Sequence, residues 1–329
     1  MNVMSISMII VSYNTCALLR NCLASVYAKV RDLALEIIVV DNASIDDSCA
    51  MVEKEFPEVH LMRNRENLGF AKANNQAIVV AKGEYVLLLN SDTVLNNNAV
   101  GIMYEFMQTH PRAAVCGPLL LNADKTVQRS IDTHPTVTSL VLRLSLAAHR
   151  DRYWRLLRDK YHPGAFDYSK RCQITDGWLT GAVLMIRKAV FSELGLLDEA
   201  YHFMMEDADW GLAVSHSSWE TWLVPEAVVA HLLGGSRTSL SEEQEISLKV
   251  QSVRQFRYFV RKNLGLVRYG AYRSVVVCCF VMNLIRRLIA AAVSSTEKRS
   301  RAIFMSRLGW QMLLASMEIG SSKALRDRQ

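Results

Sequence analysis

The sequence predicts an α/β fold built on a mixed, mostly parallel sheet with helices on both of its faces. First, short apolar runs alternate with helical patterns through the first 100 residues. Second, these runs are rich in Val, Ile and Leu, as are strands that are buried on both faces. Third, polar residues directly follow three of the runs, and an open α/β sheet binds its ligands at the carboxyl ends of its strands.

The elements of the first 100 residues follow from their local patterns. The run SMIIVS at residues 7–12 is apolar and has the length of a strand, and residues 16–30 have helical spacing. Residues 44–56 predict a helix with Ser44 as its N-cap and with Asp46 and Asp47 in its first turn. In order, the predicted strands are 7–12, 36–40, 59–62 and 85–89, and the predicted helices are 16–30, 44–56 and 69–81.

Beyond residue 113 the pattern is less regular. The segment DGWLTGAVLMI at residues 176–186 combines a turn with an apolar strand. Further strands are expected at 113–117, 119–121, 220–224 and 227–230, and helices at 137–161, 206–215 and 241–263. From residue 269 onward a helical pattern dominates and includes two amphipathic segments.

The composition describes a folded chain with an uneven charge. Half of the 329 residues are hydrophobic and 21% are charged, which is enough apolar material for a sizeable core and excludes global disorder. The net charge of +6 divides into −6 for residues 1–253 and +12 for residues 254–329. Such a basic block predicts an anionic partner. We expect a membrane surface and no nucleic acid, because the block shows no recognised nucleic-acid-binding fold.

This asymmetry predicts two domains, residues 1–240 and a basic helical region at 241–329. No run reaches the roughly 18–20 apolar residues that span a bilayer, and the N-terminus lacks the basic region of a signal peptide. The seven cysteines form no CxxC pair, which is typical of reduced thiols in the cytosol. We therefore expect a cytoplasmic protein, peripheral on the inner face of the cell membrane. The alternative is that the C-terminal helices form a cap or the interface of a homo-oligomer.

Polar residues that can carry chemistry follow three predicted strands. They are Ser12, Tyr13 and Asn14, then Asp41 and Asn42, and then Asn90, Ser91 and Asp92. A carboxylate such as Asp92, on the turn after a buried strand, can hold a hard divalent cation like Mg²⁺. With equal weight, Asp92 can simply cap the turn, because Asn, Ser and Asp are common turn residues.

The segment MEDADW gathers three carboxylates, those of Glu206, Asp207 and Asp209. Burial and like charge raise the pKa of a carboxyl group, which suits a general base that deprotonates a hydroxyl. For this cluster taken alone, the favoured alternative is an acidic first turn that the helix dipole stabilises. Trp210 beside the cluster fits a sugar-stacking surface, although a tryptophan is more often part of the core.

His231 follows a strand-like run and precedes the segment LLGGSR. Imidazole is a common ligand of divalent metals, and Arg237 could neutralise a phosphate, although a single histidine is more often structural. The motifs GxxxxGK[ST], GxGxxG after the first strand and GxSxG are absent from the sequence. Their absence counts against nucleoside triphosphatases, nicotinamide dehydrogenases and serine hydrolases.

Seven segments, taken together and in order, resemble the family 2 inverting glycosyltransferases of the GT-A fold. They are IIVSYNT (9–15), EIIVVDNASIDDS (36–48), RNRENLGFAKANNQAI (63–78), GEYVLLLNSDTVL (83–95), DGWLTGAVLMIRK (176–188), FMMEDADW (203–210) and VVAHLLGGS (228–236). The NLGFAKANN and EDADW segments are most similar to the branch that includes bacterial rhamnosyltransferases of cell-surface polysaccharide assembly. The resemblance implies a nucleotide-sugar-binding sandwich, a dTDP- or UDP-sugar donor, and Mg²⁺ or Mn²⁺ as cofactor.

The resemblance also implies roles for single residues. The nucleotide-sugar pocket would be formed by Ser12, Tyr13, Asn14, Asp41, Asn42, Asn67, Gly69, Asn74, Asn90 and Ser91. Asp41 would accept a hydrogen bond from the base, and Asp92 and His231 would bind the metal. Asp207 would be the catalytic base, with Glu206 and Asp209 in support. The sugar and the acceptor would be bordered by Trp178, Thr180, Gly181, Trp210 and Arg237.

One position departs from the family pattern, because Asn90 stands where the Asp-x-Asp metal motif begins and adds no charge. The expected activity is transfer of L-rhamnose from dTDP-rhamnose to a hydroxyl of a cell-surface polysaccharide or lipid-linked glycan precursor. Two alternatives stay open. One is the same chemistry with a UDP-hexose donor, and the other is a non-catalytic nucleotide-sugar-binding scaffold at the membrane.

Overall fold

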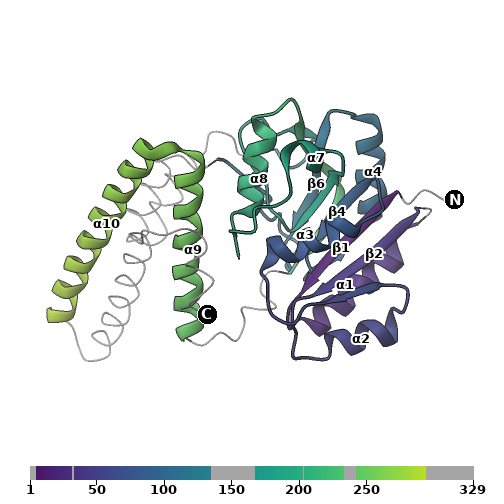
Figure 1. Ribbon diagram of the computed structural model, residues 1–329, viewed down its shortest axis with the longest axis horizontal. Coiled ribbons are helices and arrows are strands. Elements are labelled where there is room, and N and C mark those ends of the chain that lie inside the picture. Colours follow the sequence, from purple (N-terminus) through teal and green to yellow (C-terminus); the bar gives the residue numbers. More distant parts are fainter. Residues whose placement is uncertain (1–4, 32, 135–166, 203, 233–241, 294–329) are drawn as a thin grey trace. The chain divides into compact units, whose positions relative to one another are not determined.

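The computed structural model describes residues 5–31, 33–134, 167–202, 204–232 and 242–293 (Figure 1). These residues form two compact units. Of the described residues, the first unit contains 5–134 and 167–232, and the second contains α9 (Glu242–Asn263) and α10 (Gly265–Val293). The helices predicted at 137–161 and in the last amphipathic segment, and the residue Arg237, lie outside the described residues.

The first half of the large sheet is parallel. Its strands are β1 (Ile6–Ser12), β2 (Leu35–Asp41), β3 (His60–Arg63) and β4 (Tyr85–Leu89), in the spatial order β3-β2-β1-β4. In the register of β1 and β2, Ser12 lies opposite Asp41. The carboxyl ends of these strands therefore meet at one edge, as the polar strand ends predict.

The second half of the sheet is mixed. It consists of β10 (Val183–Arg187), β6 (Ala113–Leu121), β11 (Glu220–His231), β5 (Thr93–Leu95) and β8 (Cys172–Gln173). β10 is antiparallel to both β4 and β6, whereas β11 is parallel to β6 and antiparallel to β5. A separate pair joins β7 (Ile131–Asp132) to β9 (Trp178–Leu179). This mixed sheet confirms the predicted α/β fold.

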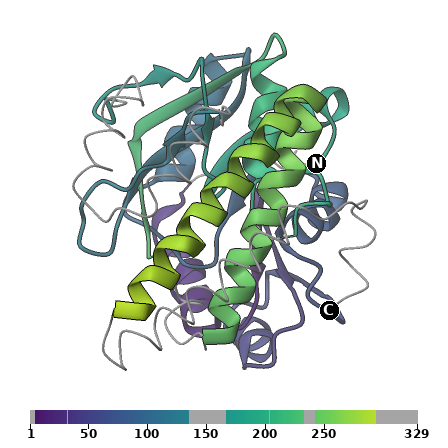
Figure 2. The ribbon, with the colours of Figure 1, turned by 90° about the vertical axis from the view of Figure 1, so that its left-hand side faces the viewer.

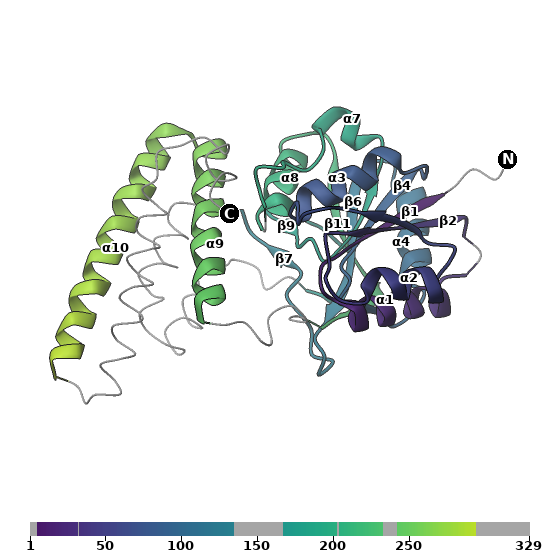
Figure 3. The same cartoon turned by 60° about the horizontal axis from the view of Figure 1, so that its bottom comes forward.

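Helices cover both faces of the sheet (Figures 1 and 3). α1 (Cys16–Lys29), α2 (Ser48–Glu55) and α4 (Ala99–Thr109) pack on one face, and α3 (Phe70–Val80), α7 (Val190–Leu194) and α8 (Glu206–Ser215) pack on the other. Along β1, Met8 and Ile10 enter the first core and Ile9 enters the second, because successive side chains of a strand point to opposite faces.

The helix predicted at residues 44–56 begins instead at Ser48. Residues 44–47 form a loop that polar contacts tie to the end of β1. The Asn14 N–H donates to Ser44 Oγ, and the Asp46 carboxylate accepts from the N–H groups of Cys16 and Ser48. Ser44 therefore does not cap the helix, and Asp46 precedes it. These contacts between distant segments outweigh the local helical pattern.

Two pairs of predicted strands are each one continuous strand. Residues 113–121 form β6 through Pro118, and residues 220–231 form β11 through Pro225. The register of β11 against β6 shifts between Val224 and Val228, and such an irregularity accommodates a proline that cannot donate to the ladder. The sequence patterns did not predict α4, β5, β7 or β8.

The second unit is a pair of helices that lie side by side (Figure 2). The ring centroids of Phe256 in α9 and Tyr272 in α10 lie 6.0 Å apart, and Phe259, Tyr272 and Val276 are buried. Among the described residues, no helix combines the length and the apolar character needed to cross a membrane.

Candidate active site

Hydroxyl groups connect the ends of β1 and β4. Thr15, which precedes α1, lies 2.9 Å from the Ser12 hydroxyl and donates to Ser91 Oγ at 3.1 Å. Asn14 has a positive φ of 53° and accepts from the Ile45 N–H through its side-chain oxygen. Tyr13 stands between these anchored residues and is 44% exposed. An exposed ring on a rigid loop at a sheet edge suits contact with a planar ligand.

Asp41 is the last residue of β2, and only one of its two carboxylate oxygens accepts a hydrogen bond in the described part of the chain. Its Oδ2 accepts from the Ser44 N–H at 3.0 Å, whereas its Oδ1 is buried without a hydrogen-bond partner in the described part of the chain. A buried acceptor without a partner is costly unless a ligand supplies a donor. The N–H of a uracil or thymine base is such a donor.

Asn42 and Asn67 brace the loop that leads into α3. The Asn42 amide donates to Asn67 Oδ1 at 2.8 Å, and its oxygen accepts from the Leu68 N–H and from the Asn64 amide. Asn67 Oδ1 also accepts from the Gly69 N–H. Asn42 is 2% exposed, so it shapes the pocket from behind.

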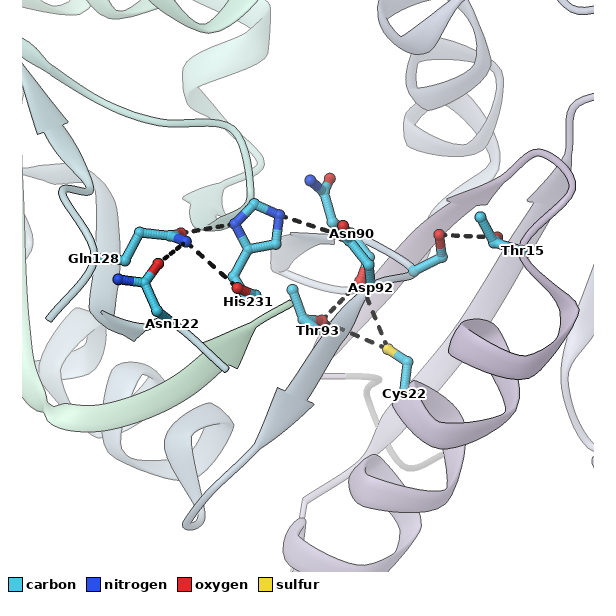
Figure 4. A network of polar contacts seen from close by, with 9 residues as sticks. Thr15, Cys22, Asn90, Asp92, Thr93, Asn122, Gln128 and His231 are labelled. Atoms are coloured by element: carbon cyan, nitrogen blue, oxygen red, sulfur yellow. Dashed lines mark hydrogen bonds and ion pairs between the residues drawn. The ribbon is translucent and has the colours of Figure 1, made fainter. Parts of the chain in front are cut away.

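Asp92 and His231 come together where β5 begins and β11 ends (Figure 4). The His231 Nε2 lies 3.2 Å from Asp92 Oδ1, and the Leu232 N–H donates to the Asp92 carbonyl at 2.9 Å. The His231 Nδ1 lies 2.8 Å from Gln128 Oε1, so Nδ1 carries a proton, and in the neutral ring Nε2 then presents a lone pair. In that neutral form two acceptor atoms face each other, an arrangement that a cation between them would stabilise.

The residues present fit a divalent metal. Two ligands of an octahedral ion with bonds of about 2.1 Å lie roughly 3 Å apart when they are adjacent, close to the observed 3.2 Å. Asn90 offers a candidate third ligand atom, because its Oδ1 is buried without a hydrogen-bond partner among the described residues. The described residues contain no group of three or more His, Cys, Asp and Glu side chains suited to a metal, so an ion bound by Asp92 and His231 would take its other ligands from groups of another kind.

The candidate base opens α8. Met205, the residue before the helix, has a left-handed φ of 81°, and Glu206 and Asp207 are the first two residues of α8. Burial raises the pKa of Asp207, although the N–H groups of Gly181 and Ala208 donate to its two oxygens and act against that rise. Burial, and then the charge of Asp207, raise the pKa of Glu206, whose Oε2 has no partner among the described residues.

Two consecutive residues connect the candidate base to the candidate metal motif. The Gly181 N–H donates to Asp207 Oδ2 at 2.8 Å, and the carbonyl of the next residue, Ala182, accepts from the Asn90 N–H at 2.9 Å. Both lie in the loop before β10, the strand that pairs with β4. The antiparallel insertion of β10 thus connects Asp207 to the backbone of Asn90, more than 100 positions away in sequence.

The remaining residues from the sequence lie around this centre in structural roles. The Trp210 indole donates to the Gly195 carbonyl and packs in the second core, and Asp209 accepts from the Tyr201 hydroxyl. Asn74 donates within its own helix to the Phe70 carbonyl. Thr180 donates through its N–H to the Ser130 carbonyl, and Trp178 is 7% exposed.

Sequence reasoning missed several residues that the fold brings to the site. They are Thr15, Asn75, Gln128 and Asp132. Asn75 joins α3 to the segment after α7 by hydrogen bonds with Leu197, and the charge of Asp132 contributes to the raised pKa of Asp207. Thr15 and Asn75 lie within the matched segments IIVSYNT and RNRENLGFAKANNQAI, so both could have been predicted from the sequence. No local pattern marks Gln128 or Asp132.

Comparison with known proteins identifies the family to which the chain belongs. The family model described as "Glycosyl transferase family 2" matches residues 7–195. An N-acetylglucosaminyl-diphospho-decaprenol L-rhamnosyltransferase of Mycobacterium tuberculosis is 27% identical over 210 residues, which cover 60% of this chain and 66% of that protein. This chain therefore matches just under two thirds of the length of that relative. A dTDP-rhamnosyl transferase of Shigella flexneri is 24% identical, with 79% of each chain covered.

A solved structure shares the fold. It is a mannosyltransferase of Pyrobaculum calidifontis in complex with GDP-Man and Mn²⁺. The TM-score is 0.54 at 14% sequence identity, and the superposition covers 98% of this chain and 88% of that chain. At this identity the likeness supports the GT-A fold alone.

Proposed function

The chain belongs to glycosyl transferase family 2, and from this premise we propose that it is an inverting, metal-dependent glycosyltransferase. Asp207 takes the proton from an acceptor hydroxyl, and the resulting oxygen attacks the anomeric carbon of the donor. The bond from that carbon to the nucleoside diphosphate breaks on the opposite side, so a single displacement inverts the configuration.

One observation carries the proposal, namely the loop at Gly181 and Ala182 that joins Asp207 to Asn90. The two backbone N–H groups on Asp207 hold its carboxylate in place, and its raised pKa favours uptake of a proton. The proposed metal ligands are Asp92 and His231, with Asn90 as a third donor. A bound divalent ion would neutralise the charge that develops on the diphosphate.

We propose dTDP-rhamnose as the donor. Asp41 offers its Oδ1 to the N–H of the base, and the relatives named as rhamnosyltransferases favour rhamnose as the sugar. Because uracil presents the same N–H as thymine, the contact with Asp41 is equally compatible with a UDP-hexose donor, and this is the second candidate.

We propose a lipid-linked glycan precursor at the inner face of the cell membrane as the acceptor, with a domain boundary near residue 240. Support comes from α10, where Val281, Met282 and Ile285 are exposed apolar residues with helical spacing. Arg268 is exposed in the first turn of the same helix, next to the exposed Val267. Cations beside an apolar helical face are typical of a helix that lies on an anionic leaflet.

Calorimetry of donor binding tests the proposal. We expect dTDP-rhamnose to bind more tightly than UDP-glucose, UDP-galactose or UDP-N-acetylglucosamine, and binding to weaken when Mn²⁺ and Mg²⁺ are withheld. Preference for a UDP-sugar would move the assignment to the second candidate. Failure of all four donors to bind would contradict the roles of Asp41 and Asp92.

A further inference from the structure

A chain of hydrogen bonds runs from the hairpin after β6 to the candidate metal ligand His231 (Figure 4). β6 and β11 are parallel, and Leu121 pairs with Ala230, so their next residues, Asn122 and His231, are neighbours at the sheet edge. The hairpin then turns back, and Leu121 bridges to Val127, which brings Gln128 beside His231.

The direction of each hydrogen bond follows from the one before it, beginning at Asp124. The Thr126 hydroxyl and N–H both donate to Asp124 Oδ1 and lower the pKa of this carboxyl group, which therefore acts only as an acceptor. Because the single hydroxyl proton of Thr126 is used for Asp124, Thr126 Oγ1 must accept from the Asn122 amide at 2.9 Å.

The same logic orients the two amides. The nitrogen of Asn122 faces Thr126, so its oxygen faces Gln128 and accepts from Gln128 Nε2 at 2.9 Å. Gln128 Nε2 also donates to the His231 carbonyl at 3.4 Å, a second contact that holds the amide in this orientation. Gln128 Oε1 is thereby left to face His231 Nδ1 at 2.8 Å.

We propose that Gln128 is a positioning residue for the metal site, and that the chain Asp124–Thr126–Asn122–Gln128 holds His231 in the Nδ1–H tautomer. This tautomer leaves the Nε2 lone pair directed toward Asp92, where a divalent metal binds. The inference rests on the proposed function, because these hydrogen bonds orient a metal ligand only if the protein binds a metal. Outer groups that orient a ligating histidine commonly contribute about 10- to 100-fold to metal affinity.

Substitutions at Gln128 distinguish an effect on the tautomer of His231 from a purely structural effect on the hairpin. Gln128→Leu keeps the approximate volume and removes the acceptor for Nδ1–H, so the dissociation constant for Mn²⁺ should rise by about 10- to 100-fold. Gln128→Glu keeps the acceptor and loses both donated bonds, so Mn²⁺ affinity should stay within about threefold of wild type. Val127→Thr, at a residue that is 53% exposed in the same hairpin, is the matched control.

The experiment combines titration of the full chain with Mn²⁺ alone and ¹⁵N NMR of its histidines in the metal-free state. His231→Gln identifies the signal of this residue among the eight histidines. We expect the Nδ1–H tautomer in wild type and its loss in Gln128→Leu, with thermal unfolding to check that each variant is folded. Equal Mn²⁺ affinity of Gln128→Leu and wild type would overturn the proposal, as would a Gln128→Glu variant as weak as Gln128→Leu.

The two readouts distinguish this inference from the proposed function. An Nε2–H tautomer in a wild-type protein that binds Mn²⁺ overturns the hydrogen-bond chain and leaves the metal-dependent transferase intact. The Nδ1–H tautomer in a wild-type protein that binds no Mn²⁺ contradicts metal dependence, and with it the purpose assigned here to Gln128.

Discussion

Two adjacent carboxylates at the start of α8 have different surroundings, and this difference separates their roles. Asp207 accepts from two backbone N–H groups, which stabilise its ionised form against the effect of burial. Glu206 is 6% exposed and has an oxygen without a partner among the described residues. Since an unpaired buried charge is costly, Glu206 holds its proton to higher pH.

Asp207→Asn should reduce sugar transfer by at least about 10²- to 10⁴-fold, because the amide cannot accept the proton of the acceptor hydroxyl. Donor binding, measured by calorimetry, should change by less than about threefold, since Asp207 does not contact the nucleotide in the proposed mechanism. The control is Asp167→Asn, which removes a carboxylate from an exposed turn. Near-normal transfer by Asp207→Asn would exclude this residue as the base.

Glu206→Gln should change how stability depends on pH. The pKa of Glu206 is raised on folding, so the native state binds more protons than the unfolded state above the ordinary pKa of glutamate. The free energy of unfolding therefore falls as pH rises from that value through the raised one, by up to about 1.4 kcal/mol per pH unit.

The Glu206→Gln variant lacks this titrating carboxyl group. Its free energy of unfolding, compared with that of wild type, should therefore increase as the pH rises. Urea unfolding of both proteins at about pH 5, 7 and 9 measures the difference. A difference that stays constant with pH would show that Glu206 does not titrate in this way.

At the scale of elements, the loop before α3 depends on a close backbone approach. Gly69 precedes the helix with a φ of +83°, and a Cβ added there would lie 2.5 Å from the His202 carbonyl oxygen. That carbonyl accepts from the Phe70 N–H, so it cannot move without loss of a contact to the first turn of α3. The segment before α8 and the start of α3 are therefore held in close backbone contact at the site.

Gly69→Ala should lower the free energy of unfolding by about 2–4 kcal/mol, because it combines an unfavourable φ with a backbone clash. Gly195→Ala is the matched control, since Gly195 has a φ of +82° and nothing within 4 Å of its added Cβ. The control should lose only about 1 kcal/mol. Urea unfolding measures both, and equal losses would show that the approach of His202 has no energetic role.

At the scale of the whole molecule, charge separates the two parts of the chain. Residues 1–253 carry a net charge of −6 and residues 254–329 carry +12. A negative body and a positive C-terminal region would orient the protein toward an anionic membrane. The exposed Arg261 and Arg268 contribute to this positive charge from α9 and from α10.

The full chain should bind vesicles that contain phosphatidylglycerol, and binding should weaken with salt because surface attraction is screened. Pure phosphatidylcholine vesicles are the control for lipid. Replacing Arg261 and Arg268 by Gln should weaken binding by roughly 10- to 30-fold, at about 1 kcal/mol for each cation. Sedimentation with vesicles measures retention, and failure to bind at low salt would contradict a membrane-bound protein.

The sequence by itself determined the fold class, most of the central strands and helices, and the family. These depend on local periodicity and on short motifs, which is why α8 begins and ends where its pattern predicts. The residues at strand ends were predictable for the same reason, because a parallel sheet brings those ends to one edge. The predicted start of α2 was wrong, since Asp46 accepts from the N–H of Cys16, 30 positions away, and lies in a loop before the helix.

Only the tertiary structure decided how the site is assembled. The antiparallel insertion of β10 brings Asp207 and Asn90 to the same loop, and the return of the β6 hairpin brings Gln128 to His231. Only the tertiary structure distinguishes residues that the motifs group together. The side-chain N–H groups of Trp210 and Asn42 donate hydrogen bonds, whereas Asp41 Oδ1 has no partner among the described residues. Hydrogen bonds of this kind join residues distant in sequence, and no local pattern encodes which partners meet.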